Sequence, residues 1–155
     1  MKVRILELIA AAIFVAAWIL AALAIPTLPA QIPTRFGLDG APEQMGSAAT
    51  LWVLPAIATG VYVLMSATQL MPRRWMNYRG VTITDENREA VYALGRAMLP
   101  AIKVGVLLTT VAVEWSTIDA AERGTMGPFF AATFLTPLAL TIGTAIYYTL
   151  KMRAV

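Results

Sequence analysis

The chain has 155 residues, of which 59% are apolar and 14% charged, with a net charge of +3. Soluble domains carry about 25% charged residues, so this composition predicts a protein embedded in a lipid bilayer. The sequence contains neither cysteine nor histidine, which excludes disulfides, thiolate or imidazole metal sites and a histidine-dependent hydrolase triad. Basic residues flank the apolar stretches, which favours lipid head groups over nucleic acid as their partner.

Four stretches are long enough to cross a bilayer as helices, since a span needs about 20 mostly apolar residues. They are expected near residues 5–25, 48–70, 98–118 and 129–150. The first exceeds the apolar core of a signal peptide, about 7–15 residues, and is expected to be a retained anchor. The predicted fold class is all-α: an integral membrane four-helix bundle, formed as a single domain by residues 1–155.

The distribution of lysine and arginine predicts the orientation. Nine basic residues lie before the first span, between the second and third, or after the fourth: Lys2, Arg4, Arg73, Arg74, Arg79, Arg88, Arg96, Lys151 and Arg153. The opposite side carries only Arg35 and Arg123. Because short cytoplasmic segments hold the excess of basic residues, both termini are predicted to be cytoplasmic. Residues 26–47 and 119–128 are then expected outside.

Small residues predict close helix packing. The first span is rich in alanine, and the fourth contains Ala139 and Gly143 one turn apart. Small side chains let helix backbones approach closely, the main attraction available in lipid. Packing within the bundle is the favoured interpretation. The alternative is contact with a second copy of the chain or another membrane subunit.

Three ionisable residues fall inside the predicted spans: Glu7, Lys103 and Glu114. Glu7 and Lys103 both lie toward the cytoplasmic side and are placed to pair across the first and third spans. Lys103 also lies close enough to the interface to extend its charge to head groups. Glu114 is about 16 Å from Lys103 along a helix, too far for contact. Structural anchoring is favoured over an ion, proton or ligand site.

The outer loop is the most patterned soluble segment. Its prolines and glycines form a motif of Pro29, Pro33, Gly40, Pro42 and Gly46. This composition predicts a compact, rigid loop with little regular structure, and Ser47 is expected to cap the second span. The candidate ligand-binding residues are Arg35, Phe36, Asp39 and Glu43. Two carboxylates alone favour an internal salt bridge to Arg35 over a metal site, and no metal or cofactor is expected.

The cytoplasmic loop contains a helix start at Thr84, followed by acidic residues that suit a helix N-terminus. Val91, Leu94 and Met98 follow at helical spacing. An amphipathic helix is therefore predicted, either resting on the membrane face or running into the third span.

Two groups of residues together form a family pattern. The outer loop carries Leu28, Pro29, Ile32, Pro33, Phe36, Gly40, Pro42, Gly46 and Ser47. The later part carries Asn77, Tyr78, Ile83, Thr84, Glu86, Asn87, Tyr92, Lys103 and residues 114–118. The chain thereby resembles a bacterial membrane domain of unknown function, found alone and at the N-terminus of SdpI-type immunity proteins. This resemblance implies the bacterial cytoplasmic (inner) membrane, and long members confer immunity to a peptide toxin and sequester a repressor.

The chain departs from that pattern at two positions. Arg35 stands where the family usually has histidine, and Ala48 where a basic residue often follows. A permanently charged arginine cannot act by titration but can hold a carboxylate such as Asp39 or Glu43.

The leading hypothesis is a non-enzymatic membrane protein whose outward loop recognises or excludes a peptide or small ligand. The sequence has no nucleophile–base set or cofactor motif, which argues against an enzyme. One alternative is an accessory subunit of a larger membrane complex. Another is a small ion- or proton-coupled transporter that uses Lys103 and Glu114.

Overall fold

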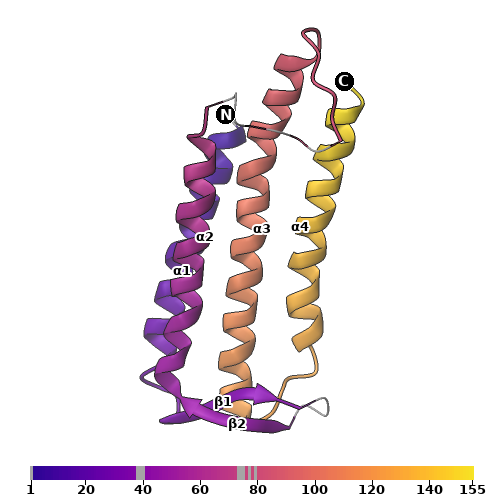
Figure 1. The fold of residues 1–155 in the computed structure, drawn as a ribbon. Helices are drawn as coiled ribbons and strands as arrows, with labels where there is room; N and C mark the ends of the chain where they lie inside the picture. Colours follow the sequence, from indigo (N-terminus) through magenta and orange to yellow (C-terminus); the bar gives the residue numbers. More distant parts are fainter. Residues whose placement is uncertain (1, 38–40, 73–75, 77, 79) are drawn as a thin grey trace.

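A computed structural model describes residues 2–37, 41–72, 76, 78 and 80–155. Its elements in chain order are α1 (Lys2–Ala24), β1 (Gln31–Phe36), β2 (Pro42–Ser47), the short 3-10 helix η1 (Ala48–Trp52), α2 (Val53–Gln69), α3 (Arg88–Arg123) and α4 (Phe130–Arg153). The four long helices stand side by side, and the strands form a hairpin across one end (Figure 1). We call this the hairpin end; α1 begins and α4 finishes at the opposite end.

Four helices are long and apolar enough to cross a membrane: Val3–Ala24, Ala48–Gln69, Arg88–Arg123 and Phe130–Arg153. The expectation of four spanning helices is confirmed for the described residues. The largest difference is in α3, which begins ten residues before the expected boundary at 98. Its 36 residues rise about 54 Å, more than the roughly 30 Å of bilayer hydrocarbon, so one end of α3 extends beyond a membrane span.

The predicted amphipathic helix is the first part of α3. Of the two alternatives, continuity with the third span is confirmed, and a separate helix at the membrane face is wrong. Thr84 precedes the helix: its Oγ1 accepts a hydrogen bond from the Asn87 N–H at 3.3 Å, while the Thr84 N–H donates to Asn87 Oδ1 at 2.8 Å. This reciprocal pair fixes the turn that leads into α3.

The core lies between α1, α2 and α3. A central cluster contains Ala10, Ala17, Ala58 and Leu107. A hairpin-side cluster contains Ala21, Ala24, Leu28, Ile32, Ala48, Leu51, Ile118 and Ala121. Fully buried alanines of α1 therefore face the other helices of the same chain, which confirms intramolecular packing for this alanine face.

The fourth helix packs chiefly along α3, away from α1 and α2 (Figure 1). Met152 is its one buried residue in the described part of the helix. Ala139 and Gly143 face outward, so this small pair does not pack inside the chain. Four of its threonines donate to the carbonyl four residues earlier in the same helix: Thr133, Thr141, Thr144 and Thr149. The arrangement is a three-helix core with a flanking fourth helix.

The hairpin corrects the prediction of a loop with little regular structure. Its antiparallel register pairs Gln31 with Ser47 and Ile32 with Gly46, and irregularities follow Pro33. Proline is tolerated because both strands of a two-stranded ribbon are edge strands. A Cβ on Gly46 would come within 2.6 Å of the Thr34 side chain, so a larger residue there requires the Thr34 side chain to move.

Two contacts fix the hairpin to the helices. Ile32 is 1% exposed and lies in the hairpin-side cluster between the helix ends. The predicted cap is also present, since Ser47 Oγ accepts from the Ala49 N–H at 3.2 Å at the start of η1. The hairpin is thus attached to the helix ends by a buried side chain and a helix cap.

Candidate functional site

A polar cluster joins α1, α2 and α3 toward the end opposite the hairpin. It consists of Glu7, Tyr62, Ser66, Gln69 and Lys103. Lys103 is fully buried, and its Nζ donates to Glu7 Oε2 at 2.5 Å and to Ser66 Oγ at 3.0 Å. Gln69 Nε2 donates to Glu7 Oε1 at 2.7 Å, and Lys103 Nζ lies 4.8 Å from the centre of the Tyr62 ring. Both charges are therefore partnered.

This geometry confirms the predicted Glu7–Lys103 pair. It also shows that extension of Lys103 to head groups is wrong, because the ammonium is buried against Glu7. Ser66 and Gln69 are not among the site residues predicted from the sequence. The available signal was two polar residues one turn apart near the end of an apolar helix.

Glu114 lies on the same interior face of α3 as Lys103. It follows Lys103 by 11 residues, which correspond to about three helical turns. The residue is fully buried, and neither carboxylate oxygen has a hydrogen-bond partner among the described residues. Glu114 therefore forms no structural pair with the described residues, and its role as a helix anchor stays a prediction.

The hairpin carries the predicted ligand-binding residues. Arg35 Nε lies 3.1 Å from Glu43 Oε2, and both side chains are more than half exposed, which confirms an internal salt bridge between these two residues. Phe36 is half-buried at the end of β1. Asp39 and Gly40, also predicted here, lie outside the described residues.

A groove of about 410 Å³ runs between the hairpin and the helix ends. Thr34 and Gln44 supply polar groups from the two strands, and Leu51 and Leu54 supply an apolar wall from the second span. Pro33 and Gly46 of the loop motif also line it, whereas Pro29 and Pro42 are exposed outside it. The motif therefore shapes one side of a mixed polar and apolar recess.

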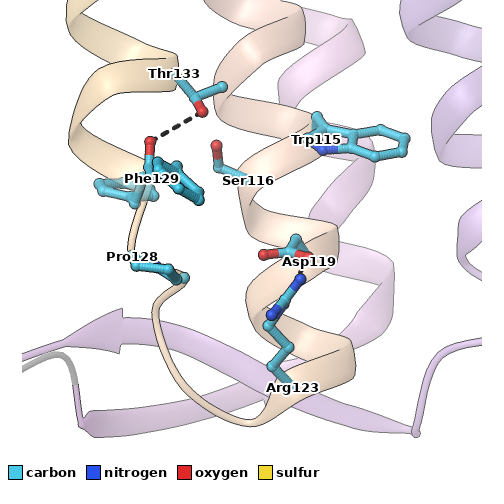
Figure 2. Close-up of a pocket in the computed structure, with 9 residues that line it drawn as sticks. Trp115, Ser116, Asp119, Arg123, Pro128, Phe129 and Thr133 are labelled. Atoms are coloured by element: carbon cyan, nitrogen blue, oxygen red, sulfur yellow. Dashed lines mark hydrogen bonds and ion pairs between the residues drawn. The ribbon is translucent and has the colours of Figure 1, made fainter.

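A second recess of about 220 Å³ lies at the same end, between α3 and the start of α4 (Figure 2). Figure 2 shows Trp115 and Phe129 beside the polar side chains of Ser116, Asp119 and Arg123. Arg123 Nε contacts Asp119 Oδ1 at 2.7 Å, one helical turn away. Both charged side chains in this recess are thus partnered by each other. The i, i+4 spacing of Asp119 and Arg123 in the sequence is typical of such a pair on a helix.

No group of three or more acidic side chains in the described part of the chain is arranged to hold a metal ion. The polar groups described above are the Lys103–Glu7 pair in the core, the exposed Arg35–Glu43 and Arg123–Asp119 pairs at the hairpin end, and the unpartnered Glu114 carboxyl.

These features define a multi-pass membrane protein with a two-stranded hairpin at one end. Residues 12–59 match the family model described as Domain of unknown function (DUF1648). The match covers half of α1, the hairpin and the start of α2, and the rest of the chain lies outside it. Neither a curated protein nor a solved structure matches the chain.

Proposed function

We propose that the protein is a non-enzymatic binding protein whose hairpin recognises a peptide or small ligand at the outer face of the bacterial inner membrane. The observation that carries this proposal is the exposed Arg35–Glu43 pair, which lies on the two-stranded ribbon beside an open groove. A ligand carboxylate can bind the Arg35 guanidinium, and apolar ligand groups suit the Leu51 and Leu54 wall.

An extended peptide suits this surface best. The ribbon has two strands in the described part of the chain, so each strand has an outer edge without a partner strand. Exposed strand edges accept extended peptides through main-chain hydrogen bonds, while pockets beside them select side chains.

The family comparison also favours the hairpin as the binding segment. Residues 12–59 include the whole hairpin, and the outer-loop pattern resembles that of SdpI-type immunity proteins. Protection against a peptide toxin is the form of binding that this resemblance favours.

Arg35→Ala is expected to weaken peptide binding by about 10- to 150-fold, because a charged hydrogen bond contributes roughly 1.5–3 kcal/mol. The measurement uses full-length protein in nanodiscs and decapeptides selected from a random library by the wild type. Arg88→Ala is the matched control, since Arg88 forms an exposed pair with Asp85 at the opposite end, at 2.7 Å. Equal affinity of the two variants, or no peptide selected by the wild type, contradicts the proposal.

We also propose that both termini are cytoplasmic and the hairpin is outside. Among the described residues, the hairpin end carries Arg35 and Arg123, and the other end carries more basic residues: Arg4, Arg88, Arg96, Lys151 and Arg153. The excess marks the cytoplasmic side.

The sequence contains no cysteine, so single-cysteine variants test this topology without background. A membrane-impermeant maleimide applied to intact cells is expected to label Thr125→Cys and not Glu86→Cys, and to label both after lysis. Both positions are exposed. Glu86 precedes α3 and Thr125 follows it, so they lie at opposite ends of the bundle. Labelling of Glu86→Cys alone in intact cells means the reverse orientation.

A further inference from the structure

Glu114 is the most unusual group in the interior of the bundle. It is fully buried in α3, and both of its carboxylate oxygens lack a hydrogen-bond partner among the described residues. Buried polar groups are nearly always partnered, and an unpartnered one indicates a functional demand.

The surroundings of Glu114 are apolar on both sides along the helix. Seven residues before it, Leu107 belongs to the central cluster, and four residues after it, Ile118 belongs to the hairpin-side cluster. Both clusters join α1, α3 and the second span, so Glu114 lies between two apolar layers of the core. Water therefore has no open path to the carboxyl in this conformation.

No charged group described in the helices packed around Glu114 is placed to compensate a negative charge on its carboxyl. Besides Glu114, the described titratable groups of α1, α2 and α3 that are at least partly buried are Glu7, Tyr62, Tyr92, Lys103 and Asp119. Glu7, Tyr62 and Lys103 lie in the polar cluster, where Lys103 pairs with Glu7, and Tyr92 lies near the start of α3. Lys103 is about 16 Å from Glu114 along the helix.

At the hairpin end, the charges are also partnered with one another. Arg35 pairs with Glu43 on the hairpin, and Arg123 pairs with Asp119 on α3. Glu122 is exposed, and the cations of α4, Lys151 and Arg153, lie in its last turn at the opposite end. An ionised Glu114 carboxylate would therefore be an isolated charge in a medium of low dielectric constant, which is prohibitively unfavourable.

We infer that Glu114 is a proton-binding site: its carboxyl holds a proton in this conformation and releases it to water at the hairpin end when the hairpin-side cluster opens. On release, the O–H bond of the carboxylic acid breaks, the proton bonds to a water oxygen, and the carboxylate keeps the electron pair. On closure, the reverse transfer restores the neutral acid. The site is independent of the ligand proposed for the hairpin.

The hairpin end is the route because the hairpin-side cluster, which includes a hairpin residue, covers Glu114 on that side. Ile32 of β1 lies in the same cluster as Ile118, one turn from Glu114. Toward the other end, the proton would have to cross the central cluster, beside which Phe14 and Tyr62 stack with their ring centres 4.9 Å apart. Movement of the hairpin thus exposes Glu114 more readily than any change at the polar cluster.

Infrared spectroscopy of the full-length protein in lipid bilayers tests the protonation. The wild type at neutral pH is expected to show a carbonyl stretch of a protonated carboxylic acid above the amide I band. Glu114→Gln is expected to lose this band, whereas Glu7→Gln and Glu122→Gln keep it. A band that persists in Glu114→Gln, or its absence from the wild type, overturns the inference.

A second measurement needs no substitution. A lipophilic carbodiimide, which reacts with protonated carboxyls in apolar surroundings, is expected to modify Glu114 of the wild type and not the ion-paired Glu7. Modification of Glu7 without Glu114, mapped by mass spectrometry, overturns the inference.

The route is tested by deuterium exchange of the same infrared band. Ile32→Ala removes cover at the hairpin and is expected to accelerate the downshift in D₂O several-fold. Leu64→Ala, a substitution on the outward face of α2, is expected to leave the rate unchanged. Equal exchange rates in the two variants overturn the hairpin route.

Discussion

Lys103→Met is expected to destabilise the folded protein by about 3–5 kcal/mol, the usual effect of removing one partner from a buried ion pair. The substitution preserves most of the side-chain volume but leaves the Glu7 carboxylate with Gln69 as its remaining hydrogen-bond donor among the described residues. Ser66 also loses the donor that Lys103 supplies. Since Lys103 connects α1, α2 and α3, the loss is expected to affect the whole three-helix core.

Unfolding in mixed detergent micelles, followed by tryptophan fluorescence, measures this effect. Lys103→Met combined with Glu7→Gln removes both charges and is expected to recover much of the lost stability, because no isolated charge remains. Lys151→Met is the control: its ammonium lies 5.7 Å from the Tyr147 ring at the exposed end of α4, and the expected change is below about 0.5 kcal/mol. A double variant less stable than Lys103→Met contradicts this interpretation.

Hydropathy predicted the four long helices well, because a spanning helix needs a run of apolar residues whatever its neighbours are. It placed the start of α3 too late. Arg88, Glu89 and Arg96 lower the local hydropathy, yet the helix continues through them, since charged residues at a helix end are compatible with the backbone and face water outside the hydrocarbon.

The hairpin was harder to predict from the sequence. Its strands are short, contain prolines and lack apolar alternation, so no local signal favours pairing. The pairing depends on a tertiary contact, the burial of Ile32 against Leu51 and Ile118. Turn-forming residues indicated a compact loop correctly but could not indicate its register.

The interior charged residues were likewise predictable from the sequence only in part. The pairing of Glu7 with Lys103 follows from their similar depth in the first and third spans. The roles of Ser66 and Gln69 depend on how α2 is rotated about its axis, which composition does not specify. For Glu114, the 11-residue spacing indicates the same face as Lys103, but the absence of a partner depends on every side chain packed nearby.

Ala17→Leu is the second substitution with a large expected effect, a loss of about 1–3 kcal/mol from overpacking. Ala17 has no exposed surface and packs in the central cluster with Ala10, Ala58 and Leu107. The added carbons push α1 away from its neighbours because Ala17 has no free space around it. The displacement is costly, since close backbone approach through small residues holds such helices together in lipid.

The adjacent residue provides a matched control with the same chemical change. Ala16 is exposed on the outward face of α1, so Ala16→Leu is expected to change the free energy of unfolding by less than about 0.5 kcal/mol in the same assay. The pair of variants also separates two interpretations of the alanine-rich helix. If the outward alanines contact a second copy or another membrane subunit, Ala16→Leu disrupts that association in native membranes while leaving the isolated chain stable. If α1 packs within its own chain alone, only Ala17→Leu has an effect, and the outward face of α1 contacts lipid.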